Sequence, residues 1–102
     1  MLMTKRQPSS AGEILVEEFL RPMRLTQAAL AEAMVVQRKH VNELCNDRRA
    51  ITAATALILA RARGNDADFW LNLQRRVDLW KTMNSPEERA RIERARPMTT
   101  AG

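Results

Sequence analysis

Apolar residues recur three and four positions apart along most of this chain, with polar residues between them. That period is typical of helices that bury one face, whereas strands alternate at every second position. Turn-forming residues are scarce, with three Gly and four Pro among 102 residues, which argues against a fold of many strands. We therefore predict an all-helical protein.

The first helix is predicted to begin after Ser10. Ser10 and Glu13 fit a capping box, in which each side chain bonds the backbone amide of the other residue. We expect the helix to end at Arg21, because Pro22 disfavours a helical residue before it. Residues 1–9 show no such period and are predicted to be a flexible N-terminal tail. The apolar stripe of the helix comprises Ile14, Leu15, Phe19 and Leu20.

Four more helices are predicted, over residues 27–34, 37–46, 53–63 and 67–83. Their expected N-caps include Thr26, Thr52 and Asp66, and Gly64 is expected to end the fourth helix of the domain. The fifth carries a broad apolar face of Phe69, Trp70, Leu73, Val77 and Trp80.

After these helices, Ser85 and Pro86 open a short polar stretch that is predicted to fray or to become ordered only on a partner. We expect a domain over residues 10–83, and a C-terminal tail over 84–102 that is either disordered or helical.

The segment over residues 27–46 has the spacing of a helix-turn-helix. Counted from Gln27, the small residue Ala31 is fifth, while Val41 and Leu44 are fifteenth and eighteenth. A small residue is needed where two such helices cross closely, and the later apolar residues fill their shared core. On periodicity alone, two ordinary amphipathic helices remain an alternative.

The exposed positions of the second of these helices carry side chains that can pair with base edges. Arg and Lys donate to guanine, Asn and Gln pair with adenine, and Glu accepts from cytosine. The alternative is a solvated polar face without a ligand. We predict base reading by Gln37, Arg38, Lys39, Asn42 and Glu43. Contacts to the DNA backbone are predicted for Gln27, His40, Asn46, Arg48 and Arg49.

Charge supports a polyanionic partner, because the formal net charge is +5. Such a surplus indicates nucleic acid or an anionic membrane surface, unless the domain is merely basic. No apolar run approaches the roughly 18 residues of a membrane span and no signal-peptide pattern opens the chain, so we expect a cytoplasmic protein without membrane contact. With one Cys and one His, no metal, cofactor or catalytic group is expected.

Four segments carry a resemblance to a known family: GEILVEEFL over residues 12–20, LTQ over 25–27 with Leu30-Ala31, RRAIT over 48–52, and FWLNLQ over 69–74. They resemble the HigA antitoxins, a group of phage-repressor-like (XRE) helix-turn-helix proteins. The resemblance covers about residues 10–82. Its helix-turn-helix part is shared by many repressors, whereas the first and last segments are more specific in combination.

This resemblance implies a five-helix DNA-binding domain that forms a homodimer on a palindromic operator near its own promoter. It also implies a cognate HigB toxin, a RelE-like mRNA endonuclease that the antitoxin binds and neutralises. The chain itself would not be an enzyme. On these grounds, Trp70, Val77 and Trp80 are expected at the dimer interface, although core packing is the simpler role for both Trp residues. Toxin binding is assigned to Glu13, Glu17 and Glu18, with a solvated face as the alternative.

Three positions depart from the family pattern. Val35 stands where Gly is frequent, and positive φ at a β-branched residue would cost about 1–3 kcal/mol, so we expect a turn that is built differently. Gln37 replaces a Ser or Thr cap at a cost of about 1 kcal/mol. Asp47 replaces a frequent Gly, which is a milder change. These changes affect the expected operator sequence and docking angle.

Two other functions remain open at this point. One is a stand-alone helix-turn-helix regulator without a toxin, which the motif cannot separate from an antitoxin. The other is a small basic ribonuclease, which the single His, the absence of Tyr and the lack of strand-like segments argue against. Cys45 is expected to be a packed thiol and not a nucleophile.

Overall fold

The computed structural model describes residues 6–98, and these residues contain no strand. The prediction of an all-helical fold is therefore confirmed. Part of each predicted tail, residues 1–5 and 99–102, lies outside the described residues. The elements in chain order are α1 (Ala11–Ile14), η1 (Leu15–Leu20), α2 (Arg21–Met23), α3 (Gln27–Met34), α4 (Arg38–Cys45), α5 (Ala53–Arg63), α6 (Ala67–Met83) and α7 (Pro86–Arg94).

The first three elements form one continuous helix that runs past Pro22. Our expectation that it ends at Arg21 is wrong, because it continues to Met23 and closes at Arg24 with a left-handed φ of 54°. Its middle part, η1, is a π-helix, in which the backbone N–H of Arg21 bonds the carbonyl of Val16. The wider π-turn gives room for a proline that has no N–H to donate and whose ring crowds the preceding turn.

Hydroxyl side chains start most of the helices. Ser10, Thr26, Thr52 and Ser85 each accept a hydrogen bond from the backbone N–H three residues further on. Asp66 occupies the N-cap position of α6, but its side chain makes no capping bond there, contrary to our expectation. Gly64 closes α5 with a φ of 77°, as predicted.

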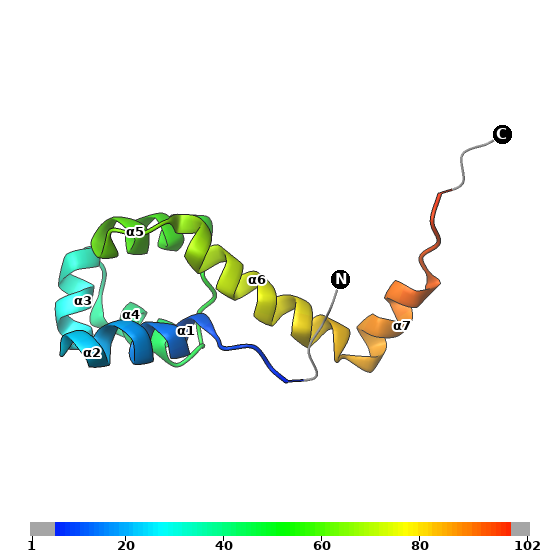
Figure 1. The fold of residues 1–102 in the computed structure, drawn as a ribbon, viewed down its shortest axis with the longest axis horizontal. Coiled ribbons are helices and arrows are strands. Elements are labelled where there is room, and N and C mark those ends of the chain that lie inside the picture. The colour runs from blue at the N-terminus through cyan, green and yellow to red at the C-terminus, as the bar shows by residue number, and fades with distance from the viewer. Residues whose placement is uncertain (1–5, 99–102) are drawn as a thin grey trace.

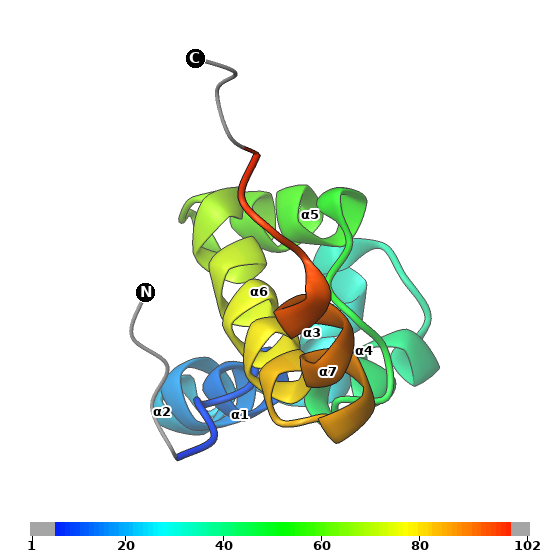
Figure 2. The same cartoon turned by 90° about the vertical axis from the view of Figure 1, so that its right-hand side faces the viewer.

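The core lies between the first helix on one side and α5 on the other, with α3, α4 and the first half of α6 completing it (Figures 1 and 2). Trp70 is fully buried, and its indole N–H donates to Asn65 Oδ1 at 3.1 Å. Phe19 and Phe69 contact the Trp70 ring at centroid distances of 5.3 and 5.0 Å. Five of the six residues expected inside the helix-turn-helix are buried, and Val36 is partly buried against the same core; the five are Leu30, Ala31, Met34, Val41 and Leu44.

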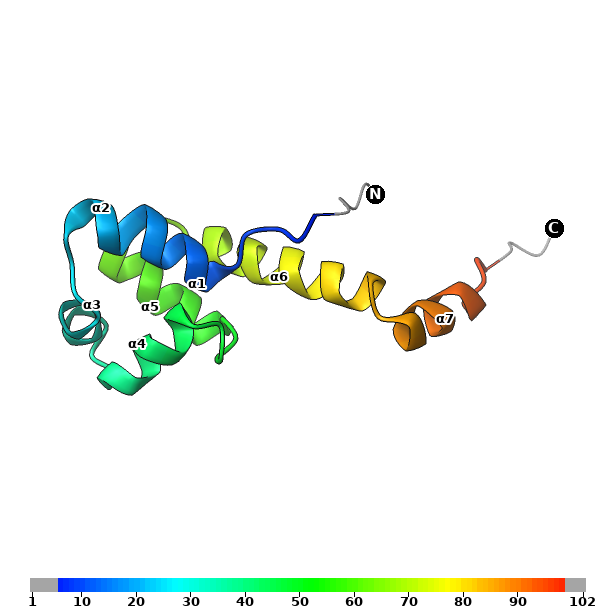
Figure 3. The same ribbon diagram turned by 90° about the horizontal axis from the view of Figure 1, so that it is seen from below.

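The second half of α6 leaves the bundle and carries α7 at its far end (Figures 1 and 3). This projection gives the molecule principal extents of 59 × 27 × 21 Å. None of the residues of α7 is buried. Of the two states expected for this part of the tail, the helical one is therefore present over Pro86–Arg94. Within residues 6–98, no helix is long and apolar enough to cross a membrane.

Gly12 lies where the first helix meets the end of α4. A Cβ on Gly12 would lie 2.4 Å from the carbonyl oxygen of Leu44 and 2.7 Å from that of Cys45. Both contacts are to backbone atoms, which cannot rotate away as a side chain can. The two helices therefore approach each other as closely as their backbones permit.

We expect Gly12→Ala to lower the free energy of unfolding by about 1–3 kcal/mol, because the added methyl group forces the two helices apart. In an open helix, the same change would raise stability by about 1 kcal/mol. Urea denaturation measures the difference, with the exposed Glu18→Ala on the same helix as a control that changes stability by less than about 0.5 kcal/mol. A Gly12→Ala protein at least as stable as the original would contradict the close approach.

Candidate nucleic-acid interface

Helices α3 and α4 form the predicted helix-turn-helix, and α4 lies at the outer edge of the bundle (Figure 3). Ala31 is buried at their junction, where its small side chain lets the helices approach. The N–H of Val36 donates to the Ala31 carbonyl at 3.0 Å, which closes α3. Val41 and Leu44 are 0% and 2% exposed, so they fix the inward side of α4 and leave its other side to solvent.

The turn between α3 and α4 passes through Val35. We expected a β-branched residue to impose a different turn, which is wrong, because Val35 adopts a left-handed φ of 56°. Its side chain is 89% exposed. The left-handed backbone of Val35 costs about 1–3 kcal/mol, which favourable packing elsewhere in the fold offsets. The N–H of Val35 donates to the Glu32 carbonyl in this turn. Gln37 occupies the N-cap position of α4 without a side-chain capping bond, as predicted.

The predicted base-reading side chains lie on the outer side of α4. Gln37, Arg38, Lys39 and Asn42 are exposed, and Glu43 is partly exposed. Residues four apart are neighbours on a helix surface, so Arg38 lies next to Asn42, and Lys39 next to Glu43. The structure thus presents amide, cationic and carboxylate groups together on one short helix.

Asn42 is paired with Gln27 across the two helices. Its Nδ2 donates to Oε1 of Gln27 at 3.1 Å. The Asn42 side chain keeps a carbonyl oxygen and one N–H for a ligand, and the Gln27 amide keeps two N–H donors. A predicted base-reading residue and a predicted backbone contact therefore act as one pre-oriented group.

Glu43 is paired with Arg49 in the loop after α4. The Nε and Nη2 of Arg49 both donate to Oε1 of Glu43, at 3.1 and 2.8 Å. These hydrogen bonds are the main reason that the pKa of Glu43 is lowered. Burial opposes them, and the charges of Arg49, Lys39 and His40 lower the pKa further. Glu43 therefore remains ionised to lower pH than a free glutamate, and its second oxygen stays available as an acceptor.

The other predicted backbone contacts differ in their accessibility. Arg48 is exposed in the loop after α4. Asn46 is exposed, and its Nδ2 donates to the Asn42 carbonyl at 2.8 Å at the end of that helix. His40 is half-buried, and its Nε2 is enclosed without a hydrogen-bond partner in the part of the chain that the structure describes.

The thiol of Cys45 is half-buried at the end of α4. Burial is the main reason that its pKa is raised, and the nearby charge of Asp47 adds to it. A thiol that resists ionisation is a poor nucleophile, which agrees with the packed role expected from the sequence. Among residues 6–98, no three His, Cys, Asp or Glu side chains gather where they could hold a metal ion.

Sequence reasoning missed two residues that hold the loop after α4. Asp47 accepts hydrogen bonds from Ser10 and Gly12, although we treated it only as a turn residue. Gln74 accepts from the N–H of Ile51 at 2.8 Å and so ties the loop to α6. The available signal for Gln74 was its place at the end of the FWLNLQ segment, whereas the contacts of Asp47 join residues too distant in the chain to be predicted.

Comparison with known proteins assigns the family. A helix-turn-helix family model matches residues 16–70. Over 92 residues the chain is 52% identical to antitoxin HigA-1 of Vibrio cholerae, an alignment that covers 90% of this chain and 87% of that protein. The chain belongs to the HigA-type antitoxins. This membership confirms the resemblance on which the site residues were placed.

Two further relatives extend the comparison of this antitoxin. This chain is 42% identical over 96 residues to the uncharacterised helix-turn-helix transcriptional regulator YbaQ of Escherichia coli K12. The alignment covers 91% of this chain and 85% of YbaQ. The solved structure of Pseudomonas aeruginosa antitoxin HigA with the higBA promoter has a TM-score of 0.79 and 33% identity, covering 90% and 99% of the two chains. These relatives are antitoxins and transcriptional regulators, which are not enzymes.

In this HigA-type antitoxin, the acidic residues predicted to bind a toxin lie on the first helix. Glu13, Glu17 and Glu18 are all exposed. Glu17 forms an ion pair with Arg21 at 2.8 Å, but both side chains are largely in solvent. Such a pair contributes less than about 1 kcal/mol to stability and can open at little cost.

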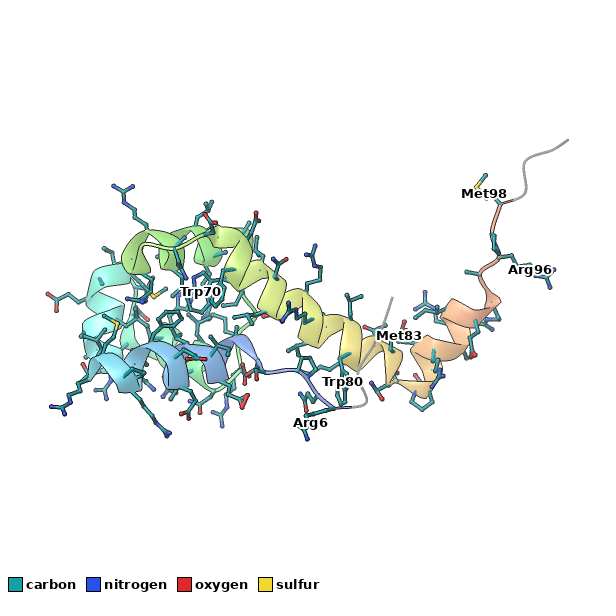
Figure 4. The ribbon with its side chains drawn as sticks, in the orientation of Figure 1. Arg6, Trp70, Trp80, Met83, Arg96 and Met98 are labelled. Carbon is teal, nitrogen blue, oxygen red and sulfur yellow. The ribbon has the colours of Figure 1, made fainter. Side chains whose placement is uncertain are left out.

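The residues predicted for a dimer interface are largely used inside the antitoxin's own fold. Trp70 lies within the bundle (Figure 4), and both Trp70 and Val77 are buried. Because their surfaces are already covered, the expectation that they contact a second copy is contradicted. Trp80 lies on the projecting part of α6 and is half-buried (Figure 4). An open groove instead follows the outer side of α6, lined among others by Leu71, Arg75, Asp78 and Leu79.

Proposed function

We propose that this antitoxin binds a palindromic operator in its own promoter and represses transcription from it. The observation that carries this proposal is the outer face of α4, where the Asn42–Gln27 pair and exposed Arg38 and Lys39 lie together. The Pseudomonas relative whose structure includes the higBA promoter supports it. The domain over residues 10–83 carries out this function.

In this arrangement, α4 enters the major groove and reads bases through Gln37, Arg38, Lys39, Asn42 and Glu43. Gln27, His40, Asn46, Arg48 and Arg49 contact the phosphates on either side. A dimer places two copies of α4 in successive major grooves, about 34 Å apart. Each neutralised phosphate releases counterions, so operator affinity falls steeply with salt.

The single variants Arg38→Ala and Lys39→Ala should each weaken operator binding by about 1–3 kcal/mol, because a base contact is lost. Fluorescence anisotropy with DNA from the chain's own promoter measures the affinity. Arg94→Ala is a matched control, since Arg94 is exposed on α7 at the opposite end of the molecule. Unchanged affinity in both α4 variants, at a salt concentration where the original protein binds, rejects α4 as the reading helix.

We propose that the dimer forms through the outer groove of α6. If two copies pack antiparallel about Arg75, Leu71 of each lies beside Leu79 of the other. In this register the two Arg75 side chains face each other across the two-fold axis, and Asp78 of the opposite copy, within one helical turn of each, offsets their repulsion. Leu79 is 39% exposed in the protomer, which leaves apolar surface that a second copy can cover.

Leu79→Lys should convert the dimer to a monomer, because it places a charge in an apolar contact. Analytical ultracentrifugation measures the mass. Leu57→Lys is the control, since Leu57 is 63% exposed on α5 and should leave the dimer intact. A dimer that survives Leu79→Lys would show that the α6 groove is not the interface.

We further propose that the partner protein is a HigB-like toxin, an mRNA endonuclease, which this chain neutralises in the cytoplasm. The relative from Vibrio cholerae is an antitoxin, which supports a toxin as the partner of this chain. A protein that acts on RNA needs a basic surface, and exposed Glu13, Glu17 and Glu18 offer the complementary charge.

The double variant Glu17→Lys/Glu18→Lys should bind the toxin at least about tenfold more weakly, because the charges at the contact then repel. The measurement is co-purification with the product of the adjacent gene, followed by titration calorimetry. Glu32→Lys/Glu93→Lys makes the same charge change elsewhere on the surface and should bind normally. Intact binding by the first variant would remove the acidic residues from the interface.

A stand-alone regulator without a toxin is the second candidate, which the 42% identity to YbaQ favours. Expression of the adjacent gene decides between the two. Growth arrest that this chain relieves supports the antitoxin, whereas a neighbour without toxicity supports the regulator.

A further inference from the structure

The turn after α4 is bonded to the start of the first helix through Asp47. Its Oδ2 accepts from the Ser10 hydroxyl at 2.6 Å, and its Oδ1 accepts from the Gly12 N–H at 3.1 Å. Ser10 Oγ in turn accepts from the N–H of Glu13 at 3.1 Å. We call Asp47, Ser10 and Gly12 the Asp47 clamp.

The clamp joins two helix ends of opposite polarity. Backbone N–H groups at the start of a helix carry partial positive charge, and a carboxylate is favoured there. Gly12 has no room for a Cβ against the carbonyls of Leu44 and Cys45, so the start of the first helix lies directly on the end of α4. The Asp47 carboxylate therefore binds at the place where the two helices already touch.

The backbone at Asp47 would suit glycine better. Its φ is 57°, and the N–H of Arg48 donates to the Glu43 carbonyl at 2.8 Å across this turn. That hydrogen-bond pattern closes a helix with a left-handed residue, for which Gly is the usual choice. A carboxylate at this position brings no benefit to the turn itself, so its contribution comes from the bonds to Ser10 and Gly12.

We propose that Asp47 is a positioning residue for DNA recognition, which sets the orientation of α4 through the Asp47 clamp. This inference rests on the proposed operator binding by α4. Without the clamp, the end of α4 and the adjacent Arg48 and Arg49 must be ordered when DNA binds, and that ordering lowers affinity. Nonspecific DNA, which requires no defined helix angle, is bound as before.

Two substitutions at Asp47 distinguish the effect of losing the clamp on DNA affinity from the effects of net charge and of turn geometry. Asp47→Gly and Asp47→Asn both raise the net charge by one, so electrostatics alone predicts tighter DNA binding by each. Both residues tolerate a left-handed φ. Only Asn keeps an oxygen that can accept from the Gly12 N–H.

We expect Asp47→Gly to bind the promoter DNA about tenfold more weakly than the original protein, and Asp47→Asn to remain within about threefold of it. On a random duplex of equal length, both variants bind as tightly as the original or slightly more tightly. Amide hydrogen exchange at Gly12 should be faster in Asp47→Gly only. Ser10→Ala removes both the bond to Asp47 and the N-cap bond from the Glu13 N–H, without a charge change, and should weaken promoter binding while leaving the random duplex unaffected.

Promoter affinity in Asp47→Gly equal to that of the original would overturn the proposal, as would an equal loss on both duplexes. A loss shared by the Gly and Asn variants would also overturn it. Should Asp47→Gly fail to fold by circular dichroism, the Asn and Ser10→Ala variants decide alone. Failure of the original protein to bind its promoter would instead reject the proposed function.

Discussion

The burial of one side of α4 is the constraint on which the rest of the structure depends. Val41 and Leu44 pack into the core that α3 and the first helix share, and Gly12 allows the backbones of the first helix and α4 to touch. Once that side is fixed, the helical period places the polar residues of α4 on its outer side, and the contacts at its end refine their orientation. Those residues are thus oriented by apolar packing, and they remain free to bind because they contribute little to the core.

Polar contacts then refine what packing has set. Gln27 holds Asn42, Arg49 holds Glu43, and Asp47 and Gln74 hold the two ends of the loop that carries Arg48. Each contact joins residues that are distant in sequence or lie on different elements. The site is therefore ordered before DNA arrives, which reduces the entropy lost on binding.

The helices and the buried residues were predictable because period and capping are local properties. Thr26, Thr52 and Gly64 marked helix ends correctly. Pro22 and Val35 misled us, because a π-turn and a strained left-handed valine are tolerated only when the surrounding fold imposes them. The assignment of Trp70 and Val77 to a dimer failed for another reason. Helical spacing identifies an apolar face but cannot say whether the same chain or a partner covers it.

The most direct test of the central claim is nuclear magnetic resonance of the labelled antitoxin during titration with its promoter DNA. We predict that the largest amide and side-chain shifts occur at Arg38, Lys39 and Asn42, with the Gln27 side chain, while signals of α5 and α7 change little. Shifts concentrated on α5 or α7, with α4 unaffected, would contradict the assignment of α4 as the DNA-reading helix.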